Sequence, residues 1–95
     1  ATRSAYSSEA KYMIAETQFN ENNTTQAEES INSLLASSGE DRYWIARSII
    51  LLSDISAKQG DNFKAKQYLN SLKNNYTEND DIQQMIKTRL TKYEK

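Results

Sequence analysis

The sequence contains no cysteine, no histidine and no proline, and it has only two glycines. The first two absences remove disulfides, thiolate chemistry, imidazole acid–base catalysis and the usual zinc ligands. Without proline, helices can continue uninterrupted between polar breaks. Long apolar runs are also lacking, since mean hydropathy is -0.87 and the longest such run, Ile49–Leu52, is too short to span a membrane. We therefore expect a helical protein with no cofactor, no metal and no membrane insertion.

Charge is nearly balanced overall but unevenly distributed. Net charge is -1, with 37% hydrophobic and 26% charged residues, as in a small helical domain with a modest core. Residues 1–41 carry two basic and seven acidic side chains, whereas residues 42–75 carry six basic and two acidic ones. This asymmetry either steers a partner or reflects solvated faces of mixed sign.

Apolar residues at a spacing of three and four predict five helices. They cover about 4–20, 26–37, 42–59, 62–75 and 81–92. Thr25 with Glu28 and Asp80 with Gln83 resemble capping boxes, and Asp61 after Gly60 is a further cap. Ser38–Gly39 is expected to end the second helix.

Each predicted helix has an apolar stripe that should face inward. The stripes are Tyr6, Ala10, Met13, Ile14 and Thr17; Ala27, Ile31, Leu34 and Leu35; Ile45, Ala46, Ile49, Ile50, Leu51, Leu52 and Ile55; Ala65, Tyr68, Leu69, Leu72 and Tyr76; and Ile82, Met85, Ile86, Leu90 and Tyr93. The third stripe covers more than one face, so this helix should be buried on several sides. No segment alternates with a period of two, and the predicted fold class is all-α.

The chain contains an internal repeat. The segment at 27–35 returns 38 positions later at 65–73, with the alanine, an aliphatic residue and the Asn-Ser-Leu trio in the same places. A fixed period of this length indicates stacked supersecondary units.

The sequence resembles the tetratricopeptide repeat (TPR) family in four small residues and in the Gly60–Asp61 turn. In the first half Asn22–Asn23 stand in place of this Gly-Asp pair. The small residues are Ala15, Ala27, Ser53 and Ala65. The resemblance implies a single domain over 1–95 that forms a short right-handed α-solenoid. Its repeats would cover about 4–38 and 42–76, followed by a capping helix at about 80–93, as at the C-terminal end of longer bacterial TPR proteins.

Several positions depart from the family pattern. Lys11 and Ile49 stand where tryptophan is usual, Thr77 stands where proline often follows, and the period is 38 residues instead of 34. Gln18 and Ser56 replace the usual tyrosine. The alternative is a generic antiparallel helical bundle.

In the TPR family the first helix of each pair lines a concave surface that binds a peptide. The resemblance places on that surface Glu9, Tyr12, Glu16, Phe19, Asn20, Arg47, Ile50, Asp54, Ala57 and Lys58, with Gln84, Lys87 and Thr88 from the last helix. The alternative for each residue is an ordinary solvated helix face, and Phe19 could instead cover the open end of the first pair. Trp44, beside Tyr43, is either an interaction anchor or a plug between neighbouring pairs.

Catalytic and nucleic-acid functions have little support in the sequence. Glu28–Glu29 and Asp80–Asp81 are not positioned acid–base pairs, and the lysines are scattered across helices. We therefore predict a non-catalytic module that binds a protein or peptide partner. The competing hypothesis is a structural, spacer or self-associating segment of a longer repeat protein. The chain begins at Ala1, which leaves a cytoplasmic or an envelope-associated location open.

Overall fold

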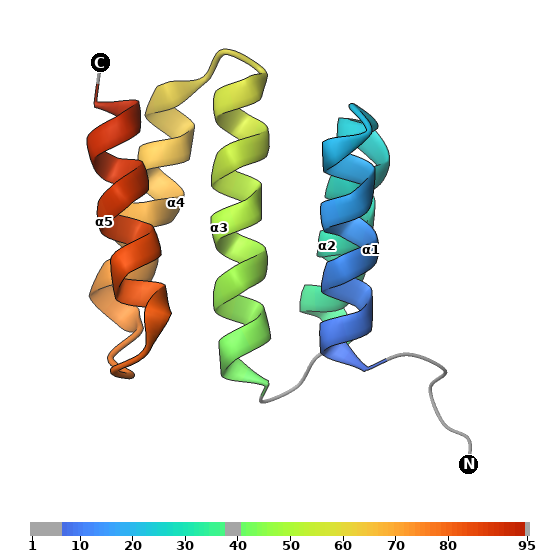
Figure 1. The fold of residues 1–95 in the computed structure, drawn as a ribbon, viewed down its shortest axis with the longest axis horizontal. Helices are drawn as coiled ribbons and strands as arrows, with labels where there is room; N and C mark the ends of the chain where they lie inside the picture. Colours follow the sequence, from blue (N-terminus) through green and yellow to red (C-terminus); the bar gives the residue numbers. More distant parts are fainter. Residues whose placement is uncertain (1–6, 38–40, 95) are drawn as a thin grey trace. The chain divides into compact units, whose positions relative to one another are not determined.

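The computed structural model describes residues 7–37 and 41–94, and within these ranges it contains five helices and no strand (Figure 1). The helices are α1 (Ser8–Asn20), α2 (Thr24–Ser37), α3 (Arg42–Lys58), α4 (Asn62–Asn75) and α5 (Asp81–Tyr93). The all-α prediction is confirmed. The last three helices match their predicted bounds to within one residue. The predicted start of the first helix at residue 4, and the end of the second at Ser38–Gly39, lie outside the described residues.

The chain divides into two compact units, within residues 1–48 and 49–95. In the first unit α1 and α2 pack against each other as a hairpin, and the unit also includes the first turns of α3. In the second unit the remainder of α3 forms a hairpin with α4, and α5 packs against α4 (Figure 1). Pairing of successive helices into hairpins is the arrangement expected of a short helical repeat.

The turns that close the two hairpins share the same backbone hydrogen bonds at an offset of 38 residues. Asn23 N–H donates to the carbonyl five residues earlier at 2.8 Å, and Asp61 N–H does the same at 2.9 Å. The residue before each donor has a positive φ, 67° at Asn22 and 87° at Gly60. Both turns therefore end their helix with a Schellman motif, in which glycine is favoured and asparagine is the next best residue. The repeat seen in the sequence is thus present in the backbone.

Two of the predicted helix caps are confirmed. The Asp61 side chain accepts a hydrogen bond from Lys64 N–H at 3.0 Å, and the Asp80 side chain accepts one from Ile82 N–H at 3.0 Å. The capping box with Gln83 does not form, because its amide donates instead to the carbonyl of Tyr76 at 2.8 Å.

The predicted cap at Thr25 is wrong. α2 begins at Thr24, and its first turn is closed by Ala27 N–H donating to Asn23 O at 2.9 Å. Thr25 is therefore already helical. The chain enters α2 directly from the Schellman turn, so Asn23 stands where Asp61 stands before α4.

The four small residues that the repeat pattern identified are fully buried. Ala15 and Ala27 lie in the first unit and Ser53 and Ala65 in the second, all at 0% exposure. Small side chains let helix backbones approach closely, while the large aliphatic residues fill the remaining space. The buried aliphatic residues of α2, α4 and α5 are Ile31, Leu34, Leu69, Leu72, Ile82 and Ile86.

α3 is buried around most of its circumference, as its sequence predicted. Its buried residues are Ala46, Ser48, Ile50, Leu51, Leu52, Ser53, Ile55 and Ser56. The buried hydroxyls of Ser48 and Ser53 donate to the carbonyls of Trp44 and Ile50, which satisfies them within the helix.

The predicted inward stripe of α1 is wrong for most of its members. Met13 is 55% exposed and Ile14 is 41% exposed, whereas Tyr12 and Ala15 are buried. Adjacent helical residues are separated by about 100° around the axis, so an error of one residue in the register moves a side chain to another face. α1 therefore packs through the ring of Tyr12 and the methyl group of Ala15, whereas the side chains of Met13 and Ile14 remain exposed. Tyr6, the first residue of that stripe, lies outside the described residues.

Candidate partner-binding face

An arginine surrounded by three aromatic rings is the most distinctive side-chain arrangement of the first unit. We call it the Arg47 cluster, and it consists of Tyr12, Tyr43, Trp44 and Arg47. Positions 43, 44 and 47 share one side of α3 because they are three or four residues apart. Tyr12 reaches them from α1.

The rings and the guanidinium of the Arg47 cluster are in direct contact. The ring centroids of Tyr12 and Trp44 are 5.4 Å apart, and Tyr43 meets Trp44 edge-on at 5.0 Å. The Cζ atom of Arg47 lies 4.9 Å from the Tyr12 centroid and 5.5 Å from that of Trp44. These distances are within the range of cation–π attraction.

The hydrogen bonds of Arg47 go to neutral oxygens. Its Nη1 donates to the Tyr43 hydroxyl at 2.9 Å and its Nη2 to the Tyr12 hydroxyl at 3.5 Å. The Tyr12 hydroxyl donates in turn to Glu16 Oε2 at 3.4 Å. The buried Nε of Arg47 has no hydrogen-bond partner among the described residues. Within that part of the chain, the positive charge is therefore not neutralised by a carboxylate in direct contact.

The ionisation states in the Arg47 cluster follow from these contacts. Burial raises the pKa of the Tyr12 hydroxyl above its ordinary value, although the neighbouring Arg47 opposes the increase. Burial also works against the charge on Arg47, but hydrogen bonds with Tyr43 and Tyr12 outweigh it and raise the pKa of the guanidinium. At neutral pH the cluster therefore has a positive charge on Arg47 beside the protonated phenol of Tyr12.

Three of the predicted site residues are brought together in this way. Tyr12, Glu16 and Arg47 form one hydrogen-bonded chain, in which the Tyr12 hydroxyl links the cation to the carboxylate. Tyr12 is only 4% exposed, so its role in the structure is to position its two neighbours. Arg47 and Glu16 are both half-buried.

The other predicted residues lie in different environments. Glu9, Asn20 and Lys58 are exposed, while Phe19 and Ala57 are half-buried. Ile50 is 1% exposed, which corrects its expected place on an open face, because this part of α3 is surrounded by packing. In α5, Gln84, Lys87 and Thr88 are exposed, and the Gln84 amide donates to the Thr88 hydroxyl at 3.2 Å.

Asp54 belongs to a separate cluster in the second unit. Arg89 Nε donates to both of its carboxylate oxygens, at 2.9 and 3.1 Å, and the Tyr93 hydroxyl donates to Oδ1. Burial, followed by the hydrogen bond to Asp54, raises the pKa of Tyr93 far above its ordinary value. This carboxylate is therefore used to hold α5 on α3 within the unit. Sequence spacing did not reveal this pairing, because Arg89 and Tyr93 lie 35 and 39 residues away.

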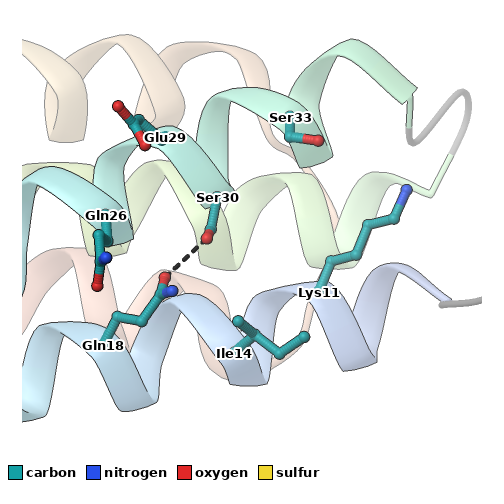
Figure 2. Close-up of a pocket in the computed structure, with 7 residues that line it drawn as sticks. All are labelled: Lys11, Ile14, Gln18, Gln26, Glu29, Ser30 and Ser33. Atoms are coloured by element: carbon teal, nitrogen blue, oxygen red, sulfur yellow. Dashed lines mark hydrogen bonds between the residues drawn. The ribbon is translucent and has the colours of Figure 1, made fainter.

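A groove runs along the hairpin between α1 and α2 and encloses about 420 Å³ (Figure 2). Its lining residues are Lys11, Ile14, Gln18, Gln26, Glu29, Ser30 and Ser33. At its base the Ser30 hydroxyl donates to Gln18 Oε1 at 2.7 Å (Figure 2). The groove thus combines an aliphatic side chain, a fixed polar pair and charges of both signs. The groove was not predictable from the apolar pattern, which places Ile14 in the core.

The described part of the chain lacks two further features. It holds no group of three or more acidic, histidine or cysteine side chains arranged to bind a metal ion. Across the same residues, no helix combines the length and the apolar character that crossing a bilayer requires.

Comparison with known proteins identifies no relative of this chain: no family model, curated protein or solved structure gives a significant match.

Proposed function

We propose that this chain is a TPR-type interaction module that binds a peptide segment of a partner protein without catalysing a reaction. The repeated Schellman turns at Asn22 and Gly60 and the four buried small residues support the repeat assignment. The binding residues would be Arg47 and Glu16, with Glu9 about two turns away on the same side of α1 as Glu16.

The proposal rests on the positive charge of Arg47 and on the groups that surround it. Its guanidinium is held by two tyrosine hydroxyls and three rings, and none of the described carboxylates pairs with it. Arginine rigidly held among aromatic rings is typical of interface hot spots, and its strongest ligands are carboxylates. We therefore expect the bound peptide to contribute an aspartate or glutamate at this point.

A selection from a random peptide library on the immobilised chain tests the proposal. The selected peptides should be enriched in acidic residues, and their affinity should fall about tenfold or more on Arg47→Gln, because one charge-assisted contact is lost. Fluorescence anisotropy with a labelled peptide measures this change.

Arg42→Gln is the matched control, since Arg42 lies on the same helix, is exposed and is outside the Arg47 cluster. Circular dichroism should show that both variants keep their helicity. If a selected peptide binds both variants as tightly as the parent chain, Arg47 does not contact the peptide and the proposed face is wrong.

A further inference from the structure

The groove between α1 and α2 lies on the side of the first hairpin that the Arg47 cluster does not use. Tyr12 points into that cluster, and Ile14, two residues later, lies about 200° further around α1. Ile14 is 41% exposed and the neighbouring Met13 is 55% exposed. This side of the hairpin therefore carries two exposed apolar side chains beside an open groove, as an interaction surface does.

A second groove of similar size lies in the other unit, between α4 and α5. It encloses about 390 Å³, and its lining includes Ile86 and Leu90 together with Lys73 and Lys87. Like the first, it combines aliphatic side chains with charged ones. Its charged side chains are mainly basic, with Glu94 as the acidic member.

The two hairpins carry opposite charge. Residues 8–36, which include the first groove, contain five acidic side chains and one basic one. Residues 62–93, which form the second hairpin with its loop, contain six basic and three acidic side chains. Glu29 of the first groove is therefore complementary to Lys73 and Lys87 of the second, and Lys11 of the first groove is complementary to Glu94 of the second.

We propose that the α1–α2 groove of one copy of this chain binds the groove between α4 and α5 of a second copy. Ile14 packs against the half-buried Leu90 of the partner copy's groove, and Glu29 faces its lysines. The contact is heterologous, because two different surfaces meet, so further copies can add head to tail. The association uses neither Arg47 nor Glu16, and it is independent of the peptide-binding proposal.

Sedimentation velocity on the full chain, from about 10 μM to about 1 mM, tests the proposal. We expect the average mass to rise with concentration, and the rise to weaken between about 50 mM and 500 mM salt because exposed charges are screened. Ile14→Glu should weaken association about tenfold or more, since it puts a charge in the apolar contact. Phe63→Glu is the matched control, because Phe63 is a 70% exposed apolar residue that lines neither groove.

A mixing experiment distinguishes this contact from a symmetric one. Ile14→Glu disables the first groove, and the double variant Lys73→Glu/Lys87→Glu disables the second. Each variant alone should be monomeric, but a mixture should form a one-to-one complex that grows no further, because one intact pair of surfaces remains. Glu29→Lys provides a second test of the first groove should Ile14→Glu lose helicity.

Two results would overturn the proposal. A parent chain that stays monomeric over the whole concentration range excludes self-association. Association that survives in Ile14→Glu and Glu29→Lys, or that is lost equally in Phe63→Glu, shows that copies meet through some other surface.

Discussion

The two units of this protein contain equivalent carboxylates that are used differently. Glu16 and Asp54 are 38 residues apart, and each accepts a hydrogen bond from a tyrosine hydroxyl, Tyr12 in one case and Tyr93 in the other. Asp54 is also bound through both oxygens by Arg89, whereas no such pair joins Glu16 to Arg47 among the described residues.

The residues that pack each hairpin are similar in both units, whereas the charged residues differ. The turns and the buried small residues repeat almost without change, because the packing of each hairpin depends on them. The charged side chains do not repeat. In the second unit Arg89 pairs with a carboxylate of its own chain, whereas in the first Arg47 donates to two tyrosine hydroxyls.

The strongest test of scaffold equivalence removes matched aliphatic side chains. Ile31→Ala and Leu69→Ala should each lower the free energy of unfolding by about 2–5 kcal/mol, because both side chains are fully buried. Urea denaturation followed by circular dichroism measures the loss. Asn32→Ala and Asn70→Ala, at exposed positions next along the chain, should change stability by less than about 0.5 kcal/mol. A small loss at only one of the two core positions would show that the hairpins are not equivalent.

The difference between the carboxylates predicts unequal costs of neutralising them. Asp54→Asn should lower stability by about 1–2 kcal/mol, because Arg89 loses its ion pair in a partly buried site. Glu16→Gln should cost less than about 0.5 kcal/mol, since the hydrogen bond that Glu16 accepts from the Tyr12 hydroxyl is long, at 3.4 Å. Equal costs in urea denaturation would contradict the proposed difference between the units.

Alkaline pH should act mainly on the second unit. Tyr93 has a pKa well above the ordinary tyrosine value of 10.0, so its contribution to stability is fully present below pH 10 and is lost as pH rises from there through its folded-state pKa. Denaturation at a series of pH values should show stability falling above pH 10, and Tyr93→Phe should reduce that fall more than Tyr12→Phe. The reverse order would indicate that the Tyr12 hydroxyl is the more strongly perturbed.

The two turns predict the smallest effects, with opposite signs. Asn22→Gly should stabilise the protein by about 0.5–1 kcal/mol, because it removes the cost of a left-handed conformation in a non-glycine residue. Gly60→Ala should destabilise it by about 1 kcal/mol through backbone strain alone, since a Cβ atom there would meet nothing within 4 Å. Thermal denaturation of both variants checks the signs, and stabilisation by Gly60→Ala would be incompatible with the observed turn.

The sequence correctly predicted features that depend on local chemistry alone, namely a turn at a glycine and an apolar stripe along one face of a helix. Gly60 and Asp61 placed the third turn correctly, and the stripes Ile31–Leu34 and Leu69–Leu72 are buried as expected. It failed on α1, where Met13 and Ile14 are exposed, because the apolar residues of this helix do not gather on a single face. It failed at Thr25 because α2 follows the Schellman turn directly and begins at Thr24, so that Thr25 is already helical.

The sequence by itself determined the helices, their hairpin pairing and the 38-residue repeat, because these depend on periodicity, on glycine or asparagine at a left-handed turn and on small residues at fixed spacing. Only the tertiary structure decided which charges are neutralised. Arg89 pairs with Asp54, and Tyr12 contacts Arg47, across 35 residues of sequence, and local spacing contains no information about such contacts. For the same reason the exposed Ile14 and its groove could be recognised only once α1 and α2 were packed together.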